Sequence, residues 1–300
     1  MKKNEDMLAY LGECYTQLEL AKKGLKAFKI KGLGFDFLLE NGLKIEGATK
    51  GIFYPKVKWD GSRYDVVLLT TKSYDTRKAV KEIREKFGKI AVLSLQNGLR
   101  NEEIIAEEMG MEYALGGITS HGATFLQAGK IYHAGKGETV IGELNGEITE
   151  RIRKIADAFN ECGIETKISR NIKKEIWRKA IINSAINGLT AVLRCKNGEI
   201  LRDAHAEKLL EEICKEGIRV ANAEGVGVDN EVIQKAKEIA YKTADNISSM
   251  LQDILKGKKT EVEEINGEIV KIAKKHGIEA PLNEFLTYAI KAMENVRHLG

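Results

Sequence analysis

The sequence is poor in several features that mark specialised classes of protein. It has only 2 prolines in 300 residues against 43% hydrophobic residues, which is typical of a globular chain rather than a disordered one. Its longest apolar runs fall far short of the ~20 residues that a membrane-spanning helix needs. The opening residues, MKKNEDMLAY, also lack the apolar segment of a signal peptide. We therefore expect a cytoplasmic protein with no membrane partner.

No charge of one sign dominates the chain. Its 48 Lys and Arg residues are interleaved with 44 Asp and Glu residues, for a net charge of +4. This balance indicates an ion-paired surface and argues against a nucleic-acid partner. The four cysteines are far apart and form no C-x-x-C pair: Cys14, Cys162, Cys195 and Cys214. We expect reduced thiols in the core and no metal site.

Short β-branched runs alternate with amphipathic stretches from about residue 42 to residue 168. The predicted elements are strands at 65–72, 89–98 and 164–169, helices at 73–88, 100–109 and 148–163, and two or three hairpin-like strands within 120–144. Continuous apolar strands that alternate with helices are typical of a parallel sheet covered on both faces. The first part of the chain is therefore predicted to be an α/β domain.

The strand pattern fades after residue 168, and helical periodicity takes its place. The predicted helices cover 171–190, 199–224, 229–255, 259–277 and 281–297. Glycines mark several of their ends, and Pro281 marks the start of the last one. We predict an α/β domain over residues 1–168 and an all-helical domain over residues 169–300.

Polar residues follow two neighbouring strands of the predicted sheet. Thr70, Thr71 and Lys72 end the first strand, and Gln96 and Asn97 end the second. Ligands of open α/β sheets bind beyond the carboxyl ends of the strands, so these residues are candidates for a binding site. Ordinary turn chemistry explains each cluster equally well on its own.

Residues 171–190 carry a polar stripe within an apolar helix. Lys179, Asn183 and Asn187 are four residues apart, and four residues of α-helix turn about 400°, so the three side chains share one narrow face. Asparagine is a poor helix former, and a buried amide has to be hydrogen-bonded. The stripe therefore indicates either a row of side chains that faces a ligand or an exposed polar face.

Five segments of the chain form a recognisable set: TTKSYDT (70–76), LQNGL (95–99), GITSHGATF (117–125), the helix KEIWRKAIINSAINGLTAVLRCKNGEIL (174–201) and the segment from SSMLQD to NEFL (248–286). In their order and spacing they resemble the ketopantoate reductase (2-dehydropantoate 2-reductase) family. The resemblance implies a Rossmann-like α/β N-terminal domain and an all-α C-terminal domain like that of 6-phosphogluconate dehydrogenase. It covers roughly residues 34 to 300.

The same resemblance assigns roles to individual residues. It makes Lys179 the general acid and Glu261 the carboxylate near lysine, substrate and cofactor. The substrate would bind through a set of polar side chains: Asn97, Asn183, Asn187, Asn197 and Ser249. The dinucleotide would lie beside Lys72, Asn97, Glu261 and the backbone around Ala123. An ammonium suits this reaction because hydride delivery to a ketone builds negative charge on its oxygen.

The chain departs from the family at its start. Where the family has G-x-G-x-x-G, this sequence has Met7, Ala9 and Gly12, so only Gly12 matches the glycines that approach the pyrophosphate. Lys31 stands where a 2′-phosphate partner is expected, which favours NADPH over NADH. The departure is open to three explanations: a sequence error, a divergent cradle, or a homologue that no longer binds the cofactor.

The resemblance implies NADPH-dependent reduction of 2-dehydropantoate to pantoate in coenzyme A biosynthesis. Two alternatives remain, reduction of another branched 2-oxo acid and a catalytically silent homologue. Apolar positions in 220–240 and in the C-terminal helices are more numerous than one small bundle has to bury, so a homodimer is also expected.

Overall fold

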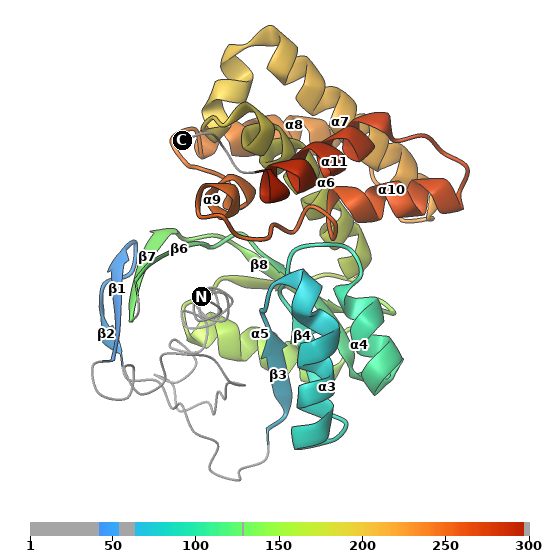
Figure 1. Cartoon of the computed structure of the whole chain (residues 1–300). Coiled ribbons are helices and arrows are strands. Elements are labelled where there is room, and N and C mark those ends of the chain that lie inside the picture. The colour runs from blue at the N-terminus through green and yellow to red at the C-terminus, as the bar shows by residue number, and fades with distance from the viewer. Residues whose placement is uncertain (1–41, 54–63, 128, 297–300) are drawn as a thin grey trace. The chain divides into compact units, whose positions relative to one another are not determined.

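The computed structural model describes residues 42–53, 64–127 and 129–296 (Figure 1). They form two compact units, of which the first runs to Gln96 and resumes over Asn101–Ile172. The second consists of Asn97–Arg100 and the chain from Lys173 onward. Three residues singled out in the sequence, Gly12, Cys14 and Lys31, lie outside the described ranges.

A five-stranded sheet forms the centre of the α/β unit. Its strands, in spatial order, are β3 (Val66–Leu69), β4 (Ala91–Ser94), β5 (Ala114–Thr119), β8 (Thr139–Glu143) and β9 (Thr166–Ile168). The first three are parallel, β8 runs antiparallel to β5, and β9 is parallel to β8. The predicted parallel sheet is therefore present with one antiparallel pairing, which the glycine-rich hairpin region introduces.

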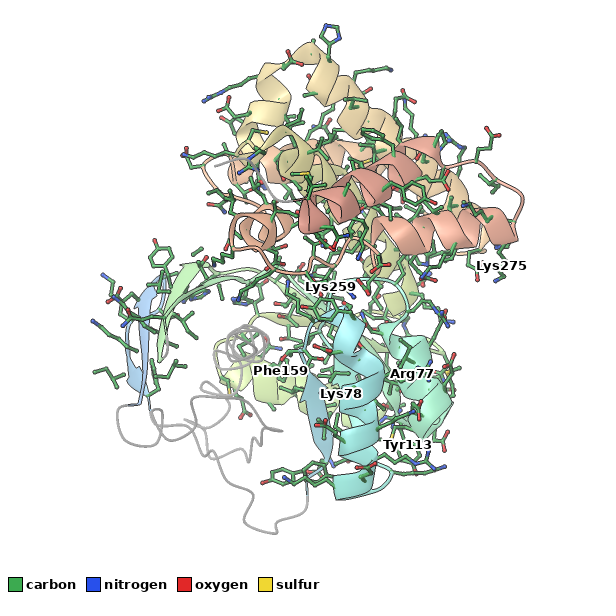
Figure 2. The ribbon with its side chains drawn as sticks, viewed as in Figure 1. Arg77, Lys78, Tyr113, Phe159, Lys259 and Lys275 are labelled. Atoms are coloured by element: carbon green, nitrogen blue, oxygen red, sulfur yellow. The ribbon has the colours of Figure 1, made fainter. Side chains whose placement is uncertain are left out.

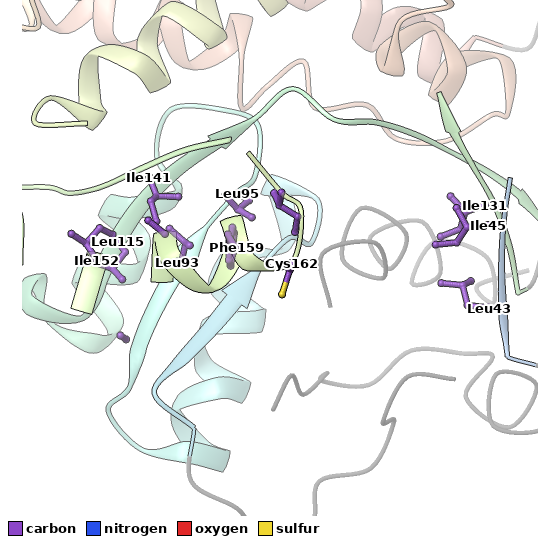
Figure 3. Close-up of a cluster of buried hydrophobic side chains, with 13 residues drawn as sticks. Leu43, Ile45, Leu93, Leu95, Leu115, Ile131, Ile141, Ile152, Phe159 and Cys162 are labelled. Atoms are coloured by element: carbon purple, nitrogen blue, oxygen red, sulfur yellow. The ribbon is translucent and has the colours of Figure 1, made fainter. Parts of the chain in front are cut away.

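Helices cover both faces of this sheet, as the alternation predicts. They are α3 (Thr76–Phe87), α4 (Asn101–Met109) and α5 (Glu150–Glu161). Val92 of β4 packs with the α3 and α4 side, whereas its neighbour Leu93 joins Ile152 and Phe159 of α5 (Figure 3). Successive residues of a strand point to opposite faces, so burial of both residues fixes a helix layer on each side.

A smaller sheet completes the α/β unit. Its spatial order is β2 (Gly51–Phe53), β1 (Leu43–Gly47), β7 (Lys130–Gly135) and β6 (Gly122–Gln127). β6 and β7 form an antiparallel hairpin, and β7 also pairs with β1 in parallel. The two or three strands predicted within 120–144 are thus present as three, of which β6 and β7 form a hairpin, whereas β8 pairs with β5 and β9 in the larger sheet.

Only helical elements occur in the described part of the second unit. They are α6 (Ile172–Leu193), the 3-10 helix η3 (Asn197–Arg202), α7 (Ala204–Ala223), α8 (Glu231–Lys242), α9 (Ser249–Leu255), α10 (Asn266–Lys275) and α11 (Pro281–Asn295). Pro281 opens α11 as predicted, because proline lacks the N–H that an initial helical position leaves unpaired.

The prediction of one helix over 229–255 is wrong. The chain forms α8 and α9 with residues 243–248 between them. Ser248 begins α9 as its N-cap by accepting a hydrogen bond from the backbone N–H of Leu251, 3.2 Å away. Apolar periodicity continues through the break, so a pattern search reads the two helices as one.

Ion pairs between elements confirm the interleaved charge pattern. Arg77 of α3, which is labelled in Figure 2, binds the Glu108 carboxylate of α4 at 2.6 Å. Lys237 of α8 binds Glu207 of α7, also at 2.6 Å. No disulfide joins the cysteines that the structure describes, and two of them, Cys162 and Cys214, are buried. Among the described helices, none is both long and apolar enough to span a bilayer.

Candidate active site

The strand ends of the α/β unit bring the predicted polar residues together. Gln96 Nε2 donates to the Thr71 carbonyl oxygen at 2.8 Å and to Thr76 Oγ1 at 2.9 Å. Lys72, half-buried, stands at the start of the short helix Ser73–Asp75. Thr70 Oγ1 is buried at the end of β3 with no hydrogen-bond partner among the described residues. A buried hydroxyl without a partner at this edge fits a bound polar ligand.

Ala123 is exposed on β6, where it pairs with His133 of β7. The His133 ring lies 3.4 Å from that of His121, measured between Nε2 and Nδ1. Burial lowers the pKa of His121 to about 4, and the charges of His133 and Lys136 act in the same direction. His121, which directly precedes β6 and lies two residues before Ala123, is therefore neutral at physiological pH.

The polar stripe of the second unit lies on α6 as predicted. Lys179 and Asn183 are half-buried, whereas Asn187 is only 8% exposed. Apolar side chains on the other faces of this helix are buried in the core, among them Ile181, which is fully buried. A solvated polar face is excluded for Asn187, because this residue is buried.

Asn97 links the stripe to a carboxylate. Its Nδ2 atom donates to Glu261 Oε2 at 3.2 Å, and its Oδ1 atom lies 3.5 Å from Asn183 Nδ2. Glu261 is 5% exposed. The three residues are far apart in the sequence but form one chain of polar contacts within the second unit.

The segment that carries Glu261 is held from several directions. Thr260 donates to Glu294 Oε1 of α11 through both its backbone N–H and its hydroxyl, each at 2.7 Å. The Glu264 carbonyl oxygen accepts from the Leu99 N–H at 3.3 Å. Burial raises the pKa of Glu264, with Lys259 opposing and Glu261 reinforcing the shift. The Glu261 carboxylate is therefore positioned by backbone contacts on both sides.

A buried network fixes the middle of α6. Asn266 Nδ2 donates to the Ser184 carbonyl oxygen and to Asn283 Oδ1, each at 3.1 Å. Asn283 in turn donates to Glu216 Oε2 through its amide at 2.8 Å and through its backbone N–H at 2.9 Å. Ser184 is adjacent to Asn183, so the network anchors the helix beside the stripe.

The structure distinguishes the two adjacent serines of the SSMLQD segment. Ser249, the predicted substrate residue, is exposed at the start of α9. Ser248 is buried, and its hydroxyl lies 2.7 Å from Thr190 Oγ1 of α6, one turn beyond Asn187. The sequence analysis missed Ser248, although a serine that precedes an apolar helical run is a recognised N-cap pattern.

Asn197 is buried at the start of η3. Its Nδ2 atom donates to Thr243 Oγ1 at 2.9 Å, while its Oδ1 atom is buried and has no hydrogen-bond partner among the described residues. Thr243 is a second residue that the sequence analysis missed. No sequence signal marks it, because its partner is distant in the chain.

An ammonium, several amides and one carboxylate make up this cluster in the second unit. Within the described ranges, no group of three or more His, Cys, Asp or Glu side chains is arranged to hold a metal ion. Asn187 makes no side-chain hydrogen bond with the described residues, so its amide and Asn197 Oδ1 are both available to a ligand. Such a set suits a small anionic ligand with carbonyl and hydroxyl groups, and a lysine can supply it with a proton.

Two family models match the sequence. The one described as ketopantoate reductase PanE/ApbA matches residues 14–146, and the one described as ketopantoate reductase PanE/ApbA C terminal matches residues 171–294.

Curated relatives named 2-dehydropantoate 2-reductase match most of the chain. A 2-dehydropantoate 2-reductase of Pyrococcus abyssi is 41% identical over 273 residues, which cover 91% of this chain and 85% of the relative. One of Halobacterium salinarum is 38% identical over 249 residues, covering 81% and 82%.

Solved structures share the fold. A 2-dehydropantoate 2-reductase from Geobacter metallireducens superposes with a TM-score of 0.85 at 26% identity, covering 92% of this chain and 95% of that one. A D-mandelate dehydrogenase with NADH and anilino(oxo)acetate has a TM-score of 0.87 at 28% identity, covering 95% of each chain.

Proposed function

Because the chain belongs to the ketopantoate reductase family, we propose that it reduces 2-dehydropantoate to pantoate with NADPH. The observation that carries the proposal is the polar cluster of Asn97, Asn183 and Glu261 beside Lys179 on α6. It combines the residue types that a carbonyl reduction needs, an ammonium and neutral amides around a buried carboxylate.

The polar residues of the helical unit have different roles in this proposal. The Lys179 ammonium stabilises the negative charge that develops on the ketone oxygen and then gives that oxygen its proton. Asn183 and Asn187 donate hydrogen bonds to the substrate without adding charge, and Glu261 orients the lysine and the ligand. The product is a 2-hydroxy acid. Ser249 keeps its predicted substrate role, with the buried Ser248 as a support for the same segment.

A reduced nicotinamide dinucleotide supplies the hydride when it is bound. The α/β unit fits such a group, since Thr70 Oγ1 is a buried hydroxyl without a partner at the carboxyl end of β3. Lys72 and the backbone around Ala123 are the described residues of this unit that we propose to hold it. Gly12 and Lys31 complete the proposal from outside the described ranges. We propose that residues 1–168 form the dinucleotide-binding domain and that residues 169–300 form the helical substrate and dimerisation domain.

Loss of NADPH absorbance measures this activity directly. We expect turnover with 2-dehydropantoate to exceed turnover with other 2-oxo acids, including a branched acid without a hydroxyl group and the aryl acid benzoylformate. The aryl acid is included because of the similarity to D-mandelate dehydrogenase. Faster reduction of another acid identifies a different substrate, and no turnover by folded protein supports the silent homologue.

Cofactor preference is tested in the same assay. The proposed 2′-phosphate partner, Lys31, favours NADPH, so kcat/KM with NADPH is expected to exceed that with NADH. Lys31→Ala should bring kcat/KM with NADPH closer to kcat/KM with NADH. An equal or higher kcat/KM with NADH contradicts this part of the proposal.

We also propose that the protein is a cytoplasmic homodimer. Two aromatic side chains of α11 support self-association, because Phe285 is 61% exposed and Tyr288 is 65% exposed. Light scattering at micromolar concentration measures the mass, and a monomer as the only species contradicts the dimer.

A further inference from the structure

The contact between Asn197 and Thr243 determines which way the Asn197 amide faces. Thr243 Oγ1 donates to the Ile239 carbonyl oxygen at 2.7 Å, and a carbonyl oxygen is unable to donate in return. The single hydroxyl proton of Thr243 is therefore committed to Ile239. Toward Asn197, Thr243 has only a lone pair to offer, so it accepts from Nδ2 at 2.9 Å.

The opposite orientation of the amide is excluded on the same ground. It would place Oδ1 against Thr243 Oγ1, and two acceptors would then face each other across a part-buried contact. Asn197 is 7% exposed, so water offers little compensation. Thr243 thus directs Oδ1 away from itself, as an acceptor that has no donor among the described residues.

Backbone contacts hold Asn197 in this place. Its N–H donates to the Asn246 carbonyl oxygen at 3.0 Å, and the next N–H, that of Gly198, donates to the Ala244 carbonyl oxygen at 3.1 Å. A Cβ atom at Gly198 would lie 2.5 Å from the Ala244 Cβ. Glycine is required there for η3 to approach residues 243–248 this closely.

Residues 243–248 also connect Asn197 with the polar stripe. At one end of this segment Thr243 holds the Asn197 amide, and at the other end Ser248 is hydrogen-bonded to Thr190 of α6. Thr190 follows Asn187 by three residues and bonds its carbonyl oxygen at 3.2 Å. The buried acceptor of Asn197 and the amide of Asn187 are therefore presented by elements that share one segment.

The chemistry of the proposed substrate supplies what Oδ1 lacks. At neutral pH 2-dehydropantoate has a carboxylate and a ketone, which only accept hydrogen bonds, and one primary hydroxyl group, which donates. Of the three groups of this substrate, only the hydroxyl group is able to donate a hydrogen bond to Asn197 Oδ1. Other 2-oxo acids that lack a hydroxyl group leave it unpaired.

We propose that Thr243 is a positioning residue that sets substrate specificity, because it turns Asn197 Oδ1 toward the hydroxyl group of the substrate. The proposal rests on the proposed function and adds to it the means by which a hydroxylated 2-oxo acid is selected. Thr243 itself acts only through Asn197.

The test compares two acids that differ in one oxygen atom. They are 2-dehydropantoate and 3,3-dimethyl-2-oxobutanoate, in which a methyl group replaces the hydroxymethyl group. We measure kcat and KM for both with wild type, with Thr243→Val, which keeps the shape but loses the acceptor, and with Thr243→Ser, which keeps the hydroxyl.

The wild type is expected to prefer the hydroxylated acid. Thr243→Val should lower kcat/KM for 2-dehydropantoate about 10-fold, mainly through KM, and should change that for the deoxy acid less than about twofold. Thr243→Ser should restore the preference to within about twofold of wild type. If Thr243→Val fails to fold, Thr243→Ala provides the same comparison.

If Thr243→Val lowers kcat/KM equally for both acids, the proposal is overturned and Thr243 is a purely structural residue. Equal kcat/KM of the wild type for both acids overturns it as well, while the reduction of 2-dehydropantoate itself still supports the proposed reaction. If folded wild type reduces neither acid, the proposed function fails, and the proposal fails with it.

Discussion

Two sets of buried asparagines in the helical unit differ in what their amides meet. Asn266 and Asn283 bond to each other, to the Ser184 carbonyl oxygen and to Glu216. Asn187 and Asn197 are also buried, yet the Asn187 amide makes no hydrogen bond with the described residues and the Asn197 amide makes one, to Thr243. An unpaired Oδ1 atom does not separate the sets, because both Asn197 and Asn266 have one; the difference is that the Asn266 Nδ2 atom bonds to two partners in the core. The same residue type therefore serves two purposes in one unit.

This difference distinguishes asparagines that hold the helices together from asparagines that we propose to bind the ligand. A buried amide that bonds to its neighbours stabilises one arrangement of helices, whereas a buried amide without partners carries a desolvation penalty in the absence of ligand. Folding tolerates that penalty where binding relieves it. We therefore expect substitutions in the first set to lower stability and substitutions in the second set to lower activity.

The largest effect on stability is expected at Glu216, which ends the buried hydrogen-bond network of Asn266 and Asn283. Its carboxylate accepts from the N–H groups of Leu282 and Asn283 at the start of α11, each at 2.9 Å. Glu216→Ala leaves these donors unpaired and should lower the free energy of unfolding by about 3 kcal/mol. Urea denaturation measures the loss. Glu212→Ala, on the surface of the same helix, is the control, and equal effects of the two changes would contradict a structural role for the network.

The largest effect on activity is expected at Lys179. Lys179→Ala removes the proposed proton donor and should lower kcat about 100-fold or more, with little change in NADPH affinity or stability. Lys173→Ala, an exposed lysine at the start of α6, is the control and should keep kcat within about twofold. Glu261→Ala, by contrast, should impair kcat and substrate affinity together. A Lys179 variant with wild-type kcat would remove the catalytic assignment.

A matched pair of asparagines tests the comparison most directly. Asn187→Ala should lower kcat/KM about 10-fold and change stability by less than about 0.5 kcal/mol. Asn266→Ala should do the reverse, with a loss of about 2 kcal/mol because the Ser184 carbonyl oxygen and Asn283 Oδ1 lose their shared donor. Kinetics and urea denaturation of both variants give the result, and similar profiles for the two would refute the distinction.

The smallest effect is expected at Glu264, whose Oε2 atom is buried with no partner among the described residues. Burial raises its pKa, so the folded state holds this proton more tightly than the unfolded state, and stability is lost as pH rises above the unfolded pKa of ~4.5. Glu264→Gln should remove this loss and raise the free energy of unfolding at pH 7 by about 1 kcal/mol. Urea denaturation of wild type and Glu264→Gln between pH 4 and pH 8 tests this direction. A wild type that is more stable than Glu264→Gln at pH 7 contradicts the prediction.

Much of the fold was predictable from local patterns. The strands around Val67 and Val92, the helices that follow them and the start of α11 at Pro281 lie where periodicity and helix signals placed them. The break between α8 and α9 carries one local signal, the N-cap serine Ser248, but apolar spacing alone does not show it, and the contacts of Ser248 with Thr190 and of Asn246 with Asn197 come from distant parts of the chain. Local apolar spacing contains no information about such partners.

The sequence by itself determined the stripe on α6, since residues four apart on an α-helix share a face whatever surrounds them. It also determined the parallel strands whose polar ends meet in Gln96 and Thr71. Only the tertiary structure decided that Ser248 and not Ser249 is buried, and that Asn197 meets Thr243. These contacts depend on burial and on the directions of hydrogen bonds between distant segments, which arise only when the helices pack.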